Sequence, residues 1–211
     1  MQRLSVGTRF AAAGAAALTL AACGSGSDSP PNSSATDAAS TTTTTTSSAR
    51  PTLTDPKLQP PSQDNQYTRG SGRPKVVFDP CTWIPDDALA KLGYDPSTRK
   101  RMPDVVAEYT FFGCQVTNPD GALQLVSGNI SLEEDKQKFA GRTQDVTING
   151  RETVIVNKLT AEECDLDMRT KAGYFEVAVI IDTPGLAKGL KPCDHIVEVA
   201  TALEPFVGKD N

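Results

Sequence analysis

The sequence predicts an α+β fold, in which a mostly antiparallel sheet is covered by short helices and by one C-terminal helix. Apolar residues alternate along 175–181, which is the period of a half-buried strand. Asn149-Gly150 stands between two short strand-like runs, and this pair favours the tight turn of a β-hairpin. Apolar residues also recur at helical spacing between about residues 192 and 206. Hairpin-linked strands interrupted by helices indicate one sheet with helices packed on it.

The first half of the domain predicts one helix and one hairpin. Segment 84–93 begins with a proline and two acidic residues, which favour a helix start, and it ends at Gly93, which can adopt the left-handed conformation that terminates a helix. Two apolar runs follow, 109–116 and 122–130. The residues between them, 118–121, read Asn-Pro-Asp-Gly and predict a hairpin turn.

The second half predicts another helix and the remaining strands. Ser131 and Glu134 have the spacing of a capping box, so we expect a helix that starts there and ends near Gly141. The runs 146–148 and 153–156 are the expected strands of the second hairpin. The alternating strand and the C-terminal helix complete the order.

Composition divides the chain into a tether and one folded domain. Residues 24–73 are rich in Ser, Thr, Pro, Gly and Ala, and they contain almost no large aliphatic side chains. Such a segment cannot bury enough apolar surface to offset the entropy cost of ordering, so we expect it to be disordered. From Lys75 onward, apolar residues reach the density of a core. The expected folded domain is therefore 75–211, which has the size of one ordinary domain.

The N-terminal 22 residues have the layout of a bacterial lipoprotein signal peptide. Arg3 and Arg9 precede and border an apolar run, 10–20, that is too short to span a bilayer, and small residues then lead to Cys23. In this layout the cysteine becomes the lipidated first residue of the mature chain. We therefore expect residues 1–22 to be removed and Cys23 to carry fatty chains such as palmitate. The protein would then be exported and anchored on the outer face of the cell membrane.

Segment 23–74 would connect the lipidated cysteine to the domain. Fifty residues of flexible chain have a root-mean-square reach of about 40 Å, and of about 150 Å when drawn into a polyproline helix. One interpretation is a stalk that lifts the domain towards the cell wall, with a run of six threonines that could accept O-linked sugars. The other is a spacer that needs little beyond solubility.

The charge of the chain argues against nucleic-acid binding. Residues 75–211 carry 15 basic and 22 acidic side chains, a net charge of minus seven. An acidic domain repels phosphate backbones and anionic lipid head groups. The fatty chains on Cys23, not a basic patch, are therefore expected to hold the protein on the membrane.

Four cysteines remain in the domain: Cys81, Cys114, Cys164 and Cys193. An even number in an exported domain indicates two disulfides. Three pairings are possible, and we expect Cys81 with Cys114 and Cys164 with Cys193, since these close the shortest loops. A zinc site usually needs paired ligands at close spacing, and the chain has one histidine and no Cys-x-x-Cys pair. We expect no metal and no cofactor.

No catalytic motif stands out, so we expect the protein not to be an enzyme. His195 lies at the edge of the apolar stripe of the last helix, without a Gly-x-Ser-x-Gly motif or a free cysteine to serve as its nucleophile, and it is interpreted as a boundary residue. The acidic segment 162–167 lacks the glycine-centred loop of a calcium site and is interpreted as a solvated edge. The basic triplet 99–101 is expected in an exposed loop.

Aromatic residues near the cysteines and in the strands are expected to belong to the core. Phe78 and Trp83 flank Cys81 and predict packing against a disulfide. Tyr109, Phe111 and Phe112 could line a pocket, but aromatic residues in strands are more often packed inside.

Short motifs give the chain a family resemblance. Phe78-Asp79-Pro80-Cys81, a following helix that ends at Leu92-Gly93, Phe112-Gly113-Cys114, and Pro192-Cys193 before the last helix occur in that order. Together with the small residues that lead to Cys23 and with the tether, this pattern resembles a family of mycobacterial- and nocardial-type actinobacterial lipoproteins of unknown function. The domain of that family opens with an Asp-Pro-Cys motif. The resemblance covers about residues 76–207 and implies an exported domain with structural cysteines. By analogy, its shape would be akin to the Mog1/PsbP-like α/β/α sandwich, and fold alone does not establish function.

Two functions are carried forward. The leading expectation is a non-enzymatic, lipid-anchored cell-envelope protein whose domain is an interaction module for a protein or cell-wall partner. The alternative is a carrier or sensor that holds a small apolar ligand, such as a lipid, in a pocket between the sheet and the helices. An apolar cavity would favour the carrier, and an exposed apolar patch beside a packed interior would favour the interaction module. An envelope hydrolase is the least favoured reading.

Overall fold

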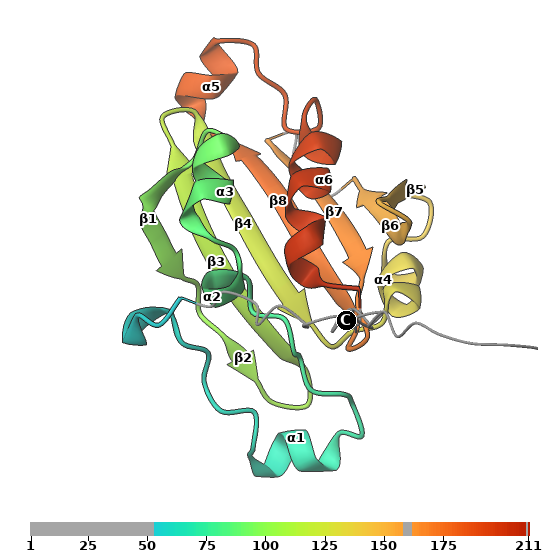
Figure 1. Ribbon diagram of the computed structural model, residues 1–211. Coiled ribbons are helices and arrows are strands. Elements are labelled where there is room, and N and C mark those ends of the chain that lie inside the picture. The colour runs from blue at the N-terminus through green and yellow to red at the C-terminus, as the bar shows by residue number, and fades with distance from the viewer. Residues whose placement is uncertain (1–52, 158–161, 210) are drawn as a thin grey trace, which may run out of the picture. The chain divides into compact units, whose positions relative to one another are not determined.

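The computed structural model describes residues 53–157, 162–209 and 211, and these form one antiparallel sheet with helices on both faces (Figure 1). The strand order is β1-β3-β4-β8-β7-β6-β5, and β2 pairs with β3. The strands are β1 (Asp95–Arg101), β2 (Val105–Val106), β3 (Thr110–Asn118), β4 (Gly121–Gly128), β5 (Thr143–Ile148), β6 (Arg151–Val156), β7 (Glu163–Arg169) and β8 (Tyr174–Ile181). The helices are η1 (Pro56–Leu58), α1 (Gln66–Gly70), α2 (Pro80–Trp83), α3 (Asp86–Lys91), α4 (Leu132–Lys138), α5 (Thr183–Ala187) and α6 (Ile196–Val207). This arrangement confirms the α+β prediction.

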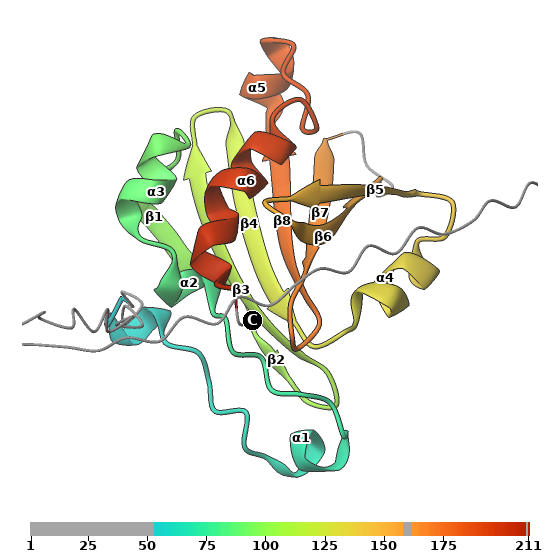
Figure 2. The same cartoon turned by 45° about the vertical axis from the view of Figure 1, so that its right-hand side comes forward.

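The main core lies between one face of the sheet and helices α2, α3 and α6, which Figure 2 shows in front of the strands. We call this the helix-covered face. Residues directly opposite each other in neighbouring strands share a face, and the register pairs Leu125 with Val177 and Leu166 with Val177. From α6, Ile196, Ala200 and Leu203 are fully buried against them. The predicted stripe of the last helix is therefore its core face.

The opposite face of the sheet has a smaller apolar cluster beneath α4. Val154 and Val156 of β6 and Tyr174 of β8 pack there with Leu132 of α4. Ion pairs lie beside this cluster. Arg169 of β7 is paired with Glu133 of α4 and with Glu152 of β6, and Glu152 is also paired with Lys136 of α4. Both faces of the central strands are thus covered, which explains why β7 and β8 are nearly continuously buried.

The local turn and cap signals form as predicted. The β3–β4 hairpin closes at Asn118–Gly121. In the β5–β6 hairpin, Asn149 and Gly150 take positive φ values of 50° and 87°, as a type I′ turn requires. Ser131 and Glu134 make the reciprocal hydrogen bonds of a capping box at the start of α4.

Both disulfides join the pairs that the shortest loops favoured. Cys81 of α2 is bonded to Cys114 of β3, with a Cα–Cα distance of 5.0 Å. Cys164 of β7 is bonded to Cys193, just before α6, with a Cα–Cα distance of 5.2 Å. Each bridge therefore attaches a segment of the helical layer to a central strand.

Residues 53–74, which we expected in the tether, pack on the domain. The Leu53 amide donates to the Thr82 carbonyl oxygen, and the Leu58 side chain is buried in the main core. The Gln63 side chain pairs with both backbone groups of Val76. This segment is ordered by a few apolar side chains and by hydrogen bonds between side chains and the backbone. The average composition of the segment shows neither kind of contact. We call residues 53–59 the strap. Residues 23–52 of the expected tether lie outside the described part of the chain.

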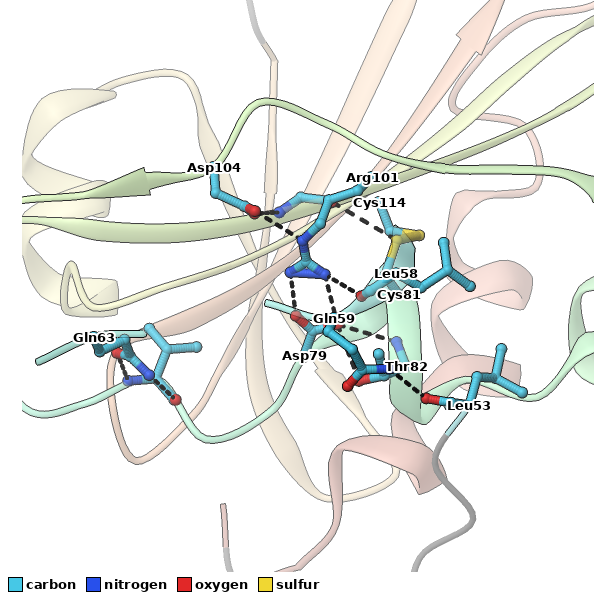
Figure 3. Close-up of polar contacts among 12 residues, drawn as sticks. Leu53, Leu58, Gln59, Gln63, Asp79, Cys81, Thr82, Arg101, Asp104 and Cys114 are labelled. Atoms are coloured by element: carbon cyan, nitrogen blue, oxygen red, sulfur yellow. Dashed lines mark hydrogen bonds and ion pairs between the residues drawn. A yellow bond between two sulfur atoms is a disulfide. The ribbon is translucent and has the colours of Figure 1, made fainter. Parts of the chain in front are cut away.

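The basic triplet is part of a strand, not an exposed loop. Arg99, Lys100 and Arg101 belong to β1, and only Lys100 is exposed. Figure 3 shows Arg101 between two carboxylates: its guanidinium is ion-paired with Asp79, and its Nε donates to Asp104 Oδ2 at 2.7 Å. Its Nη1 also donates to the Leu58 carbonyl oxygen at 2.7 Å, so one buried cation joins β1, the start of α2 and the strap.

Most of the acidic segment is also buried rather than solvated, although Glu162 at its start is exposed. Glu163–Arg169 is β7, between β8 and β6, and Asp165 and Asp167 are 0% and 1% exposed. They alternate with Cys164, Leu166 and Met168, which face the main core. The alternation of these three apolar residues is the pattern of a strand. The acidic residues between them led the sequence analysis to interpret the segment as a solvated edge instead.

Candidate functional site

A cavity of about 260 Å³ lies at one end of the sheet and is the candidate site. Its walls come from the end of α3, the β3–β4 turn, the last residues of β8, the loop before α6 and the first turn of α6. Antiparallel pairing brings the turn and the end of β8 together, since Gly121 is directly opposite Ile181. The loop and α6 then close the other side.

The lining of this cavity is mixed, with an aliphatic part beside polar and charged residues. Val179 and Ile181 of β8 line it together with Val199 of α6, and Leu92 and Leu190 complete the wall. The alternation of β8 turns Val179 to the helix-covered face, and helical spacing turns Val199 of α6 towards the same layer. The strand alternation of β8 and the helical spacing of α6, which place side chains in the core, therefore also place the aliphatic side chains of the cavity at the end of that core.

Tyr94 is the buried polar residue of the cavity wall. It is 8% exposed and follows Gly93, whose positive φ of 82° turns the chain from α3 into β1. Within the part of the chain that the structure describes, its hydroxyl makes no hydrogen bond, and its oxygen is not one of the fully enclosed polar atoms that lack a partner. Burial raises the pKa of Tyr94, so the hydroxyl stays protonated at neutral pH. A protonated phenol can donate or accept a hydrogen bond.

Charged residues of both signs surround the cavity: some are ion-paired, whereas no ion pair is found for Lys191 or Asp194 among the described residues. Lys91 is ion-paired with Asp87 at 3.0 Å, and Asp120 with Lys188 at 2.5 Å. His195 is the residue before α6, with its Nδ1 3.5 Å from Glu198. Such a rim has no strong preference for an anion or a cation.

His195 is not the boundary residue that the helical stripe predicted. Its side chain is 75% exposed because α6 begins only at Ile196, and His195 is its N-cap rather than part of the helix. The expected helix start near Pro192 is therefore several residues too early. An exposed histidine paired with an exposed Glu198 has no fixed orientation of the kind that general-base catalysis requires.

The loop that forms the outer wall of the cavity is held in place. Cys193 in this loop is bonded to Cys164, which is buried in β7. At the other end of the loop, the Leu190 amide donates to the Gly185 carbonyl oxygen at 3.2 Å. The wall is thus attached to the sheet at one end and to α5 at the other.

Three exposed apolar side chains come from the loop that walls the cavity and from the helices before and after it, and Leu190 among them lines the cavity. Leu186, Leu190 and Val197 are 43%, 37% and 44% exposed, and they come from α5, the following loop and the first turn of α6. We call these three residues with the cavity the apolar end of the domain. Exposed large aliphatic residues close to a cleft are more informative than the same residues scattered singly.

Two larger hollows are more open, and their lining residues are mostly polar or charged. The first, of about 640 Å³, lies by the β5–β6 turn, and its central cation, Arg151, is fully engaged with Glu204 and with the carbonyl oxygens of Arg169, Gly208 and Asn211. The second, of about 580 Å³, lies along the strap and β1. Their charged side chains hold the fold together, so they are weaker candidates than the apolar end.

The remaining sequence-predicted residues are structural where the structure describes them. Phe78 is fully buried, with its ring edge-to-face against Trp83 and Phe175. Phe112 is also buried, whereas Tyr109 is 37% exposed beneath the guanidinium of Arg73. Cys23 lies outside the described residues. In the described ranges, no group of three or more potential ligands could hold a metal ion, and none of the helices there has the length and apolarity to cross a membrane.

Comparison with known proteins adds a family to this geometry. No curated protein and no solved structure matches the chain, and the Mog1/PsbP-like shape stays a prediction. One family model, described as "Protein of unknown function (DUF3558)", matches residues 18–205. This match spans the described domain from the strap to α6. The chain therefore belongs to the DUF3558 family.

Proposed function

We propose that this protein is a non-enzymatic lipoprotein, anchored through Cys23 on the outer face of the cell membrane, whose domain binds a protein or cell-wall partner through the apolar end. The observation that carries the proposal is the exposure of Leu186, Leu190 and Val197 on α5, the following loop and the start of α6, with Leu190 lining the cavity. The layout of residues 1–23 supports the anchor.

The packing of the rest of the domain supports an interaction module. The core side chains of α6, Ile196, Ala200 and Leu203, are already fully buried against the sheet. A partner could therefore bury further apolar surface mainly at exposed side chains such as those of the apolar end. A central apolar group with a polar rim is the usual anatomy of a protein interface. The charged residues around the cavity supply that rim.

Site-specific photo-crosslinking in the organism that makes the protein tests this proposal. A photoreactive residue in place of Leu186 should give a discrete crosslinked product, because this side chain would be covered by the partner. The matched control replaces Gln144, an exposed residue of the edge strand β5 far along the sheet order from the site. The product should be lost when Leu190→Glu is added, since a charge at the centre of an apolar contact is costly.

The anchor is tested in the same cells by Cys23→Ser. We expect this variant to leave the membrane fraction or to remain unprocessed, and to lose label from a fatty-acid analogue. Equal crosslinking from both positions would contradict a specific interface at the apolar end. Undiminished fatty-acid label on Cys23→Ser would contradict the lipoprotein assignment.

The second candidate function is a carrier or sensor of a small apolar ligand. The cavity between α3, α6 and the end of the sheet favours it, because this is where such a ligand would be enclosed. Its volume of about 260 Å³ is slightly below the usual range for pockets of drug-sized ligands. A membrane lipid with long chains would not fit inside, so the ligand of this candidate is small.

A further inference from the structure

We propose that the cavity of the apolar end binds a compact, uncharged amphiphile, whose apolar body of about ten non-hydrogen atoms fills the cavity and whose single hydroxyl or carbonyl oxygen hydrogen-bonds to Tyr94. This inference rests on the second candidate function and specifies its ligand class. The three observations behind it are the cavity volume, the hydroxyl of Tyr94 and the charge of the rim.

The volume limits the size of the ligand. An apolar cavity of about 150 Å³ in another protein accommodates benzene. The cavity here, at about 260 Å³, is large enough for a group of roughly twice that size, such as two fused rings or a short branched chain. The aliphatic side chains of Val179, Leu190 and Val199 offer this group contacts but no hydrogen bonds.

Tyr94 supplies the polar contact. A hydroxyl that lines a cavity and makes no hydrogen bond to the protein is available to a hydrogen-bonding group of a ligand. Tyr94 is 92% buried, lines the cavity, and its hydroxyl has no partner among the described residues. A ligand oxygen placed against this hydroxyl would therefore bind better than the same apolar body without the oxygen.

The rim favours a neutral ligand. Lys91 and Asp120 are each engaged with an oppositely charged neighbour, and His195 is near Glu198. Lys191 and Asp194 also line the cavity, and their opposite charges give it no net preference for an anion or a cation. A charged ligand would have to compete with these pairs and would leave water on entering the aliphatic part of the cavity. Phosphates and carboxylates are thus disfavoured as the buried part of the ligand.

The site is also largely preformed. The Cys164–Cys193 bond holds the loop that carries Leu190 and Pro192, and β8 and α6 hold the other walls. A preformed pocket does not pay the entropy of ordering its loop when the ligand binds. A small ligand, which makes few contacts, depends on this saving more than a large one.

The test compares two probes that differ by one hydroxyl, 2-naphthol and naphthalene. Binding is measured by ligand-observed nuclear magnetic resonance and by competition, on the purified full chain with Cys23→Ser, so that no detergent tails compete for the cavity. We expect 2-naphthol to bind at one site and about fivefold more tightly than naphthalene, which is the usual range for one neutral hydrogen bond. Tyr94→Phe should remove this difference and leave naphthalene binding unchanged.

Two tryptophan variants locate the site. Leu190→Trp should abolish binding of both probes, because the indole would occupy the mouth of the cavity, whereas Val197→Trp, on the outward side of α6, should not. Failure of both probes to bind, or binding that Leu190→Trp leaves intact, would overturn the inference. Equal affinity of the two probes for the unaltered protein would overturn the role of Tyr94. These measurements use no partner protein and no membrane, so their failure is distinct from failure of the crosslinking test.

Discussion

Replacement of Arg101 should destabilise the domain more than any other single charge change in its basic triplet. The guanidinium is ion-paired with Asp79 and Asp104 and also binds the Leu58 carbonyl oxygen. Arg101→Met keeps most of the side-chain volume but leaves two carboxylates without their cation. Asp79 is 4% exposed and Asp104 11% exposed at the side chain, so water can replace little of what is lost.

The size of the effect follows from burial. Removing one partner of a buried ion pair typically costs about 3–5 kcal/mol. Burial already raises the pKa of Asp79 from its usual value, so the carboxyl can take up a proton when its cation is gone. This relief limits the loss to about 3 kcal/mol near neutral pH. For a domain of this size, that corresponds to a fall in the thermal midpoint of roughly 6–12 °C.

The assay is thermal unfolding followed by circular dichroism, with Lys100→Met as the matched control on the same strand. Lys100 is exposed, so its replacement should change stability by less than about 0.5 kcal/mol. Because the folded-state pKa of Asp79 lies above its unfolded value, the unpaired charge is costly above that pKa, and the cost is relieved as the pH falls through it. The deficit of Arg101→Met should therefore be smaller at pH 5 than at pH 8.

Two outcomes would refute this reasoning. One is an Arg101→Met midpoint no lower than that of Lys100→Met. The other is a failure of Asp79→Asn to recover part of the loss when it is combined with Arg101→Met, since neutralising the orphaned carboxylate should remove its penalty. Either result would mean that the buried ion pairs do not hold the strap and β1 together.

Three further predictions concern the disulfide, the pH dependence and the domain boundary. Cys164→Ala with Cys193→Ala should cost about 3 kcal/mol and lower the thermal midpoint by more than about 5 °C, with circular dichroism at room temperature unchanged. Arg169 lowers the pKa of Glu152 to about 2 from a usual value of 4.5, so this pair contributes stability above pH 4.5 that is lost as the pH falls towards 2; Arg169→Gln should lower the midpoint more at pH 7 than at pH 2.5. Limited digestion with a protease of broad specificity should leave a core that starts at or before residue 53, and a core starting near residue 75 would contradict the packing of the strap.

The elements that the sequence predicted are those with a local physical signal. The Asn149-Gly150 turn and the Ser131 cap depend on residues within a few positions of each other, and both form. β8 was identifiable because its alternation is uninterrupted by charge on the core side.

The missed elements are those in which charge masked a strand or in which long-range contacts order the chain. In β7, Asp165 is buried on the face opposite the main core. From the sequence alone, acidic residues in this segment indicated a solvent-exposed segment. β1 contains Pro96 and three basic residues, and its order depends on Asp79 and Asp86, which lie elsewhere in the chain. The strap is held by the side chains of Leu53 and Leu58 and by hydrogen bonds to its backbone groups, which no composition measure detects.

The candidate site could not have been assembled from the sequence. Tyr94 and Leu190 are almost one hundred residues apart, and the β3–β4 turn lies between them in the sequence. The pairing of β4 with β8 brings that turn to the end of β8, where the cavity forms. The one signal available in advance was Pro192-Cys193, which indicated that the loop before the last helix is fixed to the sheet. His195 drew attention as a rare residue type, yet it lies on the rim and exposed.

Native mass spectrometry of the protein extracted from the membranes of its own source tests the central claim most directly. One spectrum reports both the mass of the chain and the mass of whatever stays bound to it. The account predicts a chain that begins at Cys23 and carries acyl groups, together with a bound partner that is lost in the Leu190→Glu variant. A chain that still begins at Met1, or a bound partner that Leu190→Glu leaves in place, would contradict it.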